Sequence, residues 1–381
     1  MAKINVISPY FINVAATNLT SAKLEIIIYD GVANTSWAGS PQYTLTSTAI
    51  NAKLTFEISE LIKDYILAEF NGDYPTLNTS LTEATTRYVD YRITKSISGV
   101  AQTPDTPIYA NKAFYGYGYF EDGPNPQFDQ GYLQSNTTIL KPDDAPARIA
   151  IDPTNITSVA FLHKGQQTYS FTPSGTYKIE DNIIYISNAA AAVDGYKDRV
   201  LLSSGTYEES LCINNFLKEF SVDTTDTIYV SGVEGVTAIK VNSISECKHT
   251  PYKLTFINKF GAYQNLWMFK RTNKTLTTSE EKFKKNIISD GSYATYNHQR
   301  LVLTKNGQES LVLNSGYYPE SNNELFKQML LSEKVWLEYE DKTLPVNIKS
   351  SNIAFKTNLN DKLIDYTVEL DFAYETINNI R

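Results

Sequence analysis

Few residues in this sequence have the types and spacing that a catalytic or metal site requires. The chain has three histidines, His163, His249 and His298, and none has a second histidine within four residues. Cys247 and His249 are the one close cysteine–histidine pair, whereas a structural zinc site uses about four such ligands. A glycine-rich phosphate loop, an H-E-x-x-H pair and a G-x-S-x-G elbow are also missing. We therefore expect no metal site, no cofactor and no catalytic residues of these kinds.

Carboxylates are the remaining candidates for catalysis. They cluster at Glu121-Asp122 and in the run Glu338-Tyr339-Glu340-Asp341. A glycosidase needs only two carboxyl groups, about 5 to 10 Å apart in a cleft. Solvated turns and charged strand ends, which discourage pairing at sheet edges, explain the same residues. We favour the second interpretation and predict that the protein is not an enzyme, with a polysaccharide hydrolase as the least favoured alternative.

Tyrosines are the other conspicuous feature, with 27 Tyr against 17 Phe. Tyr115, Tyr117 and Tyr119 alternate in the segment AFYGYGYFEDGPNPQFDQGYL, which is rich in glycine and proline and reads as a loop. Alternating rings could form a stacking platform for a glycan. A tyrosine-rich contact loop or strand explains the same pattern, and we favour it because such residues suit protein contact surfaces.

Composition and charge exclude several classes of protein. The net charge is −8 and the pI is about 5.1, which argues against a general nucleic-acid binder. The basic run at Lys282, Lys284 and Lys285 is interpreted as a solvated helix face. The two cysteines, Cys212 and Cys247, do not form a disulfide framework, and we expect reduced, buried thiols. No signal peptide or membrane-spanning run is visible, so synthesis in a cytoplasm is expected.

The hydrophobic pattern indicates a mainly β chain with a few short helices. Residues 1–146 are expected to form a β-rich domain with one short helix, which Ser59 caps and Asn71-Gly72 ends. Residues 147–247 show short strands at regular spacing, typical of a small β-sandwich or barrel. Helical turns are expected at 189–192 and 211–220.

Residues 248–381 are expected to form a C-terminal β domain. It opens with a hairpin around Phe260-Gly261, and its amphipathic helix is predicted at 322–334. The strict alternation from Tyr366 to Phe372 predicts a long terminal strand. Thr278 and Glu281 have the spacing of a capping box, which predicts a polar helix to about residue 286. Asn306-Gly307 is interpreted as the turn of a hairpin between strands 301–303 and 311–313.

Segments at both ends carry a family resemblance. They are SPYFINVAATNLTSAKLEIIIYDG, LTFEISELIKDYI, YKLTFINKFGAYQNLWMFKR, LNSGYYPESNNELFKQMLLSEKVWLEY, PVNIKSSNIAFKTNLNDKLIDYTVELDFA and INNIR. These segments resemble a family of structural proteins from tailed bacteriophages that infect Bacteroidetes such as flavobacteria. The order of hairpin, helix and long terminal strand is similar to the tube-forming domains of phage tails and baseplate hubs.

The resemblance implies a virion protein of the tail, baseplate or neck that acts by self-assembly. Its partners would be further copies of itself and other virion proteins, with no nucleic acid and no membrane insertion. The candidate interface anchors are Tyr115, Tyr117, Tyr119, Phe260, Trp267 and Trp336, although we slightly favour packing in the core for both tryptophans. The alternative function is a receptor- or glycan-binding module on the virion.

Overall fold

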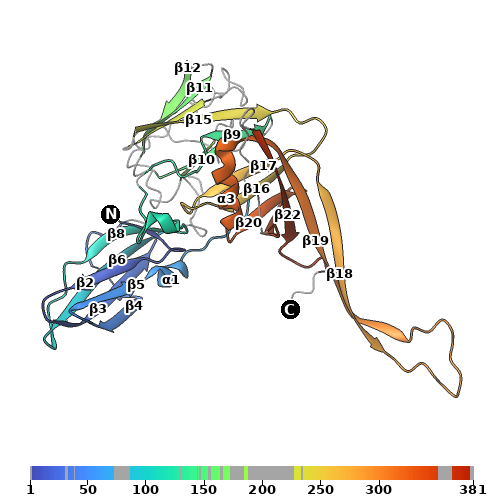
Figure 1. Ribbon diagram of the computed structural model, residues 1–381, viewed down its shortest axis with the longest axis horizontal. Coiled ribbons are helices and arrows are strands. Elements are labelled where there is room, and N and C mark those ends of the chain that lie inside the picture. The colour runs from blue at the N-terminus through green and yellow to red at the C-terminus, as the bar shows by residue number, and fades with distance from the viewer. Residues whose placement is uncertain are drawn as a thin grey trace. The chain divides into compact units, whose positions relative to one another are not determined.

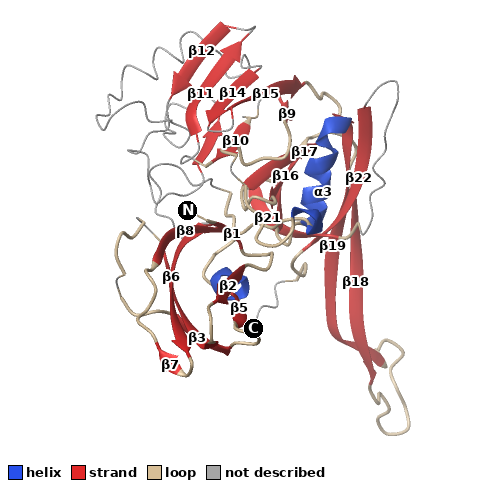
Figure 2. Ribbon diagram, turned by 60° about the vertical axis from the view of Figure 1, so that its left-hand side comes forward, coloured by secondary structure: helices blue, strands red, loops and turns tan. Residues whose placement is uncertain are grey.

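The computed structural model is mainly β, as the sequence predicts, with several sheets and short helices (Figures 1 and 2). It describes residues 2–30, 33–37, 39–72, 86–128, 130–143, 145, 147–152, 156–163, 166–171, 184–187, 227–232, 235–350 and 363–377. The helical turns expected at 189–192 and 211–220, and Cys212, lie outside these ranges.

The chain forms two compact units. Unit 1 contains Met1–Ser245, Thr255–Leu266 and Ser321–Glu333, and unit 2 contains Glu246–Leu254, Trp267–Glu320 and Lys334–Arg381. Each unit is therefore assembled from segments that are separated in the sequence. The helix α3 (Asn323–Leu331), which the sequence assigns to the C-terminal domain, belongs to unit 1. The three-domain division after residues 146 and 247 stays a prediction.

The first part of unit 1 contains a six-stranded sheet and a small two-stranded sheet. The strands of both sheets come from the same stretch of the chain. The large sheet has the order β1-β8-β6-β3-β4, and β7 pairs with β6. Its strands are β1 (Lys3–Asn5), β3 (Leu19–Tyr29), β4 (Tyr43–Thr48), β6 (Thr86–Ile97), β7 (Val100–Ala101) and β8 (Ile108–Phe114). The small sheet pairs β2 (Phe11–Ala15) with β5 (Lys53–Glu57). Strand β1 is fully buried and runs parallel to β8.

The helix α1 (Ser59–Lys63) is shorter than the apolar pattern suggests. Its N-cap is Ile58, whose side chain provides no capping hydrogen bond, so the predicted cap at Ser59 is wrong. Ile66 and Phe70 are nevertheless buried, but in chain that is not helical. Burial rather than helical periodicity thus explains the apolar residues between 64 and 70.

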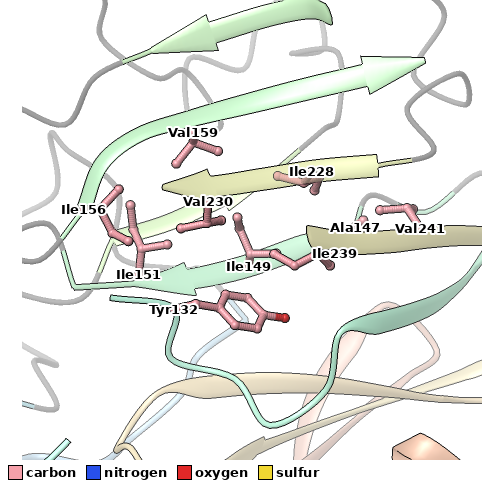
Figure 3. Packing of buried hydrophobic residues seen from close by; sticks show 10 residues of the cluster. All are labelled: Tyr132, Ala147, Ile149, Ile151, Ile156, Val159, Ile228, Val230, Ile239 and Val241. Atoms are coloured by element: carbon pink, nitrogen blue, oxygen red, sulfur yellow. The ribbon is translucent and has the colours of Figure 1, made fainter. Parts of the chain in front are cut away.

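The second part of unit 1 is a pair of packed sheets. The larger has the order β12-β11-β14-β15-β9, and the smaller pairs β10 with β13. The strands are β9 (Thr138–Pro142), β10 (Arg148–Ile151), β11 (Ile156–His163), β12 (Gln166–Phe171), β13 (Ile184–Ser187), β14 (Thr227–Gly232) and β15 (Gly235–Ile244). Branched aliphatic side chains from β10, β11, β14 and β15 form one core with Tyr132 (Figure 3). The edge strand β9 and Tyr132 both precede residue 147 in the chain.

Unit 2 is built on long antiparallel strands. Five strands follow the order β20-β21-β22-β19-β18, and β16 and β17 continue this order at the β20 end. The strands of unit 2 are β18 (Asn273–Lys284), β19 (Arg300–Pro319), β20 (Val335–Tyr339), β21 (Lys342–Ile348) and β22 (Leu363–Phe372). Strands β16 (Tyr252–Ile257) and β17 (Tyr263–Met268) are divided between the units, because Thr255–Leu266 belongs to unit 1. The predicted hairpin around Phe260-Gly261 is confirmed in β16 and β17. The alternation in β22 is confirmed too, because every second side chain from Ile364 to Phe372 is buried.

Two predictions in the C-terminal third are wrong. Residues 278–286 do not form a helix, because residues 273–284 are strand β18, which pairs along its whole length with β19. Asn306-Gly307 is not a turn, because both residues lie inside the single long strand β19. In β19, Gly307 faces the Leu276 side chain, and its carbonyl oxygen accepts a hydrogen bond of 2.7 Å from the Thr376 N–H. The two residues support a continuous strand instead.

Glu246 in unit 2 predicts a measurable dependence of stability on pH. A hydrogen bond from the Lys270 ammonium (2.6 Å), followed by one from the Lys248 N–H (2.9 Å), lowers the pKa of the Glu246 carboxyl from 4.5 to about 2. A lowered folded pKa contributes stability above pH 4.5, and this contribution is lost as the pH falls from 4.5 toward 2. When the pH is lowered from 6 to 3, we expect the urea concentration at the midpoint of unfolding to fall less for Glu246→Gln than for the wild type. Glu121→Gln, at an exposed residue of unit 1, is the control, and an equal loss in Glu246→Gln and the wild type would contradict the assignment.

Candidate functional site

The predicted tyrosines come together with Phe260 in unit 1, where three distant segments meet. The first is residues 114–120, which follow β8 and contain Tyr115, Tyr117 and Tyr119. The second is the turn 258–262 between β16 and β17, and the third is the helix α3. We call Tyr115, Tyr117, Tyr119 and Phe260 the aromatic cluster.

The backbones of the first two segments are in direct contact. The Tyr117 N–H donates to the Lys259 carbonyl at 2.9 Å. A Cβ atom at Gly116 would lie 2.4 Å from the same carbonyl oxygen, and one at Gly261 would lie 2.8 Å from the Tyr115 nitrogen. Gly261 also has a φ of +76°, which L side chains rarely adopt. The two glycines therefore permit an approach that no larger residue allows.

A network of buried amides holds the turn 258–262. The Asn258 side chain accepts hydrogen bonds at Oδ1 from the N–H groups of Phe260 (3.0 Å) and Ala262 (3.1 Å). Its Nδ2 donates to the Leu133 carbonyl (2.7 Å) and to Gln264 Oε1 (2.9 Å). Asn258 is completely buried. Since buried amides are stable only when they are hydrogen-bonded, this residue fixes the shape of the turn.

The tyrosine hydroxyls reach carboxylates on and next to α3. Tyr115 donates to Glu333 Oε2 at 2.7 Å, and Tyr119 donates to Glu324 Oε1 at 2.5 Å. Burial, followed by these hydrogen bonds to carboxylates, raises the pKa of both hydroxyls above the ordinary value of 10. Both side chains thus stay protonated and donate across the physiological range.

The rings of the cluster are covered by other side chains of unit 1. The Lys327 ammonium lies 3.6 Å from the centroid of the Tyr119 ring, and the Lys259 ammonium lies 5.2 Å from it. Tyr115 and Phe260 are 6% and 5% exposed. A sugar ring needs an open aromatic face, which the buried Tyr115 does not offer. Tyr117 and Tyr119 are half-buried, and sugar binding there stays a prediction. The geometry instead suits a cluster that fastens α3 and the turn to residues 114–120.

The two tryptophans proposed as anchors lie in unit 2. Trp336, in β20, is 8% exposed, and Trp267, in β17, is half-buried. The Trp267 carbonyl accepts from the Tyr318 hydroxyl at 2.7 Å. These positions fit core packing, and the role of either tryptophan in an interface stays a prediction.

The most exposed part of unit 2 was not predicted as a site. Residues 276–309 form a two-stranded ribbon in which β18 and β19 pair only with each other, because β19 begins its pairing with β22 at Ser310. We call residues 276–309 the arm, and Figures 1 and 2 show its strands continuing past the end of β22. No side chain between residues 273 and 306 is buried. No regular alternation of polar and apolar residues marks the arm, because the residues of β18 are mostly polar.

Large apolar side chains are nevertheless exposed along the arm. They include Phe283, Ile288, Tyr293, Tyr296, Val302 and Leu303, which are 44% to 83% exposed. The basic residues Lys282, Lys284 and Lys285, interpreted from sequence as a helix face, belong to the same ribbon and the loop that follows it. Several large exposed apolar residues on one short segment are typical of an interaction site.

The residues considered for metal binding and catalysis are dispersed. In the part of the chain that the structure describes, no group of three or more His, Cys, Asp or Glu side chains could hold a metal ion. Cys247 is a free, exposed thiol, so the expectation of a buried one is wrong for this residue. Glu340 and Asp341 form the tight turn between β20 and β21, with φ of +49° and +60°. The longest helix in the described ranges is too short and too polar to cross a membrane.

No family model and no curated protein matches the chain.

Proposed function

We propose that this protein is a structural component of a tailed bacteriophage virion, in the tail, baseplate or neck, and that it acts by self-assembly. The sequence segments that resemble phage structural proteins support the proposal. The mainly β architecture fits it, since the resemblance implies sandwich or barrel domains arranged side by side. The observation that carries it is the arm, which exposes large apolar side chains of the kind found at protein interfaces.

The mechanism is interface burial in a symmetric oligomer. A heterologous contact, in which one patch meets a different patch on the next copy, closes into a ring when the rotation between copies permits. In a closed ring, the same contact is repeated once for every copy. Chemical catalysis has no part in this function.

The mass of the purified protein in solution tests the proposal. We expect light scattering across a concentration series to give a discrete oligomer of three or more copies, and electron microscopy of that fraction to show rings. A mass equal to one chain, 42.8 kDa, at every concentration would contradict self-assembly.

A glycan-binding module is the alternative that this geometry favours less. Of the tyrosines that would have stacked on a sugar, Tyr115 is buried, and the ammonium groups of Lys327 and Lys259 lie near the ring of Tyr119.

A further inference from the structure

We infer that the distal part of the arm, residues 282–305, docks on an acidic surface of a second copy of this chain. We call these residues the arm tip. The inference rests on the proposed self-assembly and names the surface that carries it out. Four properties of the arm tip support it, namely its lack of a core, its exposed apolar side chains, its charge and its cross-strand pairing.

The arm tip has nothing to bury within its own unit. A two-stranded ribbon in water is marginally stable at best, and this one contains no buried side chain. It still carries large apolar residues, among which Tyr296 is 83% exposed, Leu303 is 65% exposed and Ile288 is 63% exposed. A partner that covers these side chains would supply the apolar burial that the free ribbon lacks.

The charge of the arm tip is opposite to that of the rest of the chain. The tip has five basic residues and one acidic residue, which gives +4, so the remainder of the chain carries −12 to reach the total of −8. The basic residues are Lys282, Lys284, Lys285, Arg300 and Lys305, and the acidic one is Asp290. Complementary charge steers association and suppresses wrong partners.

A like-charge pair points to an acidic partner more directly. Lys284 and Arg300 are directly opposite each other in the β18–β19 ladder. Like charges at such positions destabilise a ribbon. Lys282 forms an ion pair with Glu280, and the Lys305 ammonium lies 3.8 Å from a carboxylate oxygen of the same residue. Lys284 and Arg300, in contrast, form no ion pair within the described residues. Carboxylates from a partner would relieve the repulsion between them.

The same charges define the symmetry of the contact. Two arm tips, each at +4, repel each other, so a two-fold pairing of tip with tip is disfavoured. A tip that binds the acidic remainder of the next copy makes a heterologous contact, which produces a ring or a filament rather than a dimer. Nucleic acid is the competing acidic ligand. Phosphates would leave the exposed aliphatic side chains uncovered, whereas a protein surface can bury them.

Two pairs of matched variants of the full chain test the inference. Lys284→Glu with Lys285→Glu changes the tip charge by −4, and Lys53→Glu with Lys342→Glu makes the same change at exposed strand residues elsewhere. Ile288→Ser with Tyr296→Ser removes apolar area from the tip, and Ile50→Ser with Val236→Ser is its control at similarly exposed positions. Circular dichroism verifies that each variant is folded.

Light scattering across a concentration series is the measurement. We expect each tip variant to need at least about a tenfold higher concentration for half-assembly, and each control to assemble like the wild type. Tip variants that assemble as well as the wild type would overturn the arm contact and leave the proposed function intact. A wild type that never assembles would overturn both. Binding of a short DNA duplex that is lost in the tip variants would replace the second copy by nucleic acid.

Discussion

The Asn258→Ala variant should lose about 4 kcal/mol of unfolding free energy, the largest effect expected for any single substitution in unit 1. The substitution removes the acceptor of the Phe260 and Ala262 N–H groups and the donor to the Leu133 carbonyl. Each buried polar group that loses its partner costs about 1 to 3 kcal/mol. Urea unfolding followed by circular dichroism measures the loss.

Asn13→Ala is the control, and a second variant of Asn258 separates the role of its accepting oxygen from that of its donating nitrogen. Asn13→Ala removes one exposed hydrogen bond, from Thr55 at 2.7 Å, and should cost less than about 1 kcal/mol. Asn258→Asp keeps the acceptor for the turn but can donate to the Leu133 carbonyl only when protonated. Its folded pKa is then raised, so its deficit relative to the wild type should shrink from pH 7 to pH 4. A deficit that does not change with pH would show that the donor half contributes nothing.

The Gly116→Ala variant should lose about 3 kcal/mol, because the added methyl group meets backbone rather than a mobile side chain. Its Cβ would lie 2.4 Å from the Lys259 carbonyl oxygen and 3.1 Å from the Gly261 nitrogen. Those atoms cannot move away without breaking the hydrogen bond from Tyr117. Urea unfolding again measures the change, together with hydrogen exchange of residues 258–262, which should become faster.

Gly99→Ala is the matched control for the steric part of this effect. Gly99 has a φ of +83° but no atom within 4 Å of its added Cβ, so it tests conformational strain alone. We expect about 1 kcal/mol there. Equal losses at the two glycines would mean that the contact between residues 114–117 and the turn is not tight.

The parts of the fold that were predicted correctly have strong local periodicity. The terminal strand β22 alternates over its full length, and the apolar residues Leu325, Phe326 and Met329 on one face of α3 are all buried. The parts that were predicted wrongly depend on a partner strand. β18 is a strand because it pairs with β19, and its polar sequence satisfies a capping-box pattern equally well.

The candidate site shows the same difference between a local pattern, which is visible in the sequence, and a distant partner, which is not. The alternation of Tyr115, Tyr117 and Tyr119 singled out three residues that lie in one cluster, but it could not identify their partners. Glu333 and Glu324 are 218 and 205 residues away from the tyrosines that they bind. Asn258 shows no periodicity at all, so its buried network could be found only from the three-dimensional structure.

The same long separations determine when the aromatic cluster can form during synthesis. Tyr119 leaves the ribosome 205 residues before Glu324, which at ~5–20 residues per second means roughly 10 to 40 s without its helix. The turn that covers Tyr115 also comes from residues made much later. A nascent chain therefore displays a row of tyrosines for many seconds, during which a chaperone that holds aromatic segments would bind it.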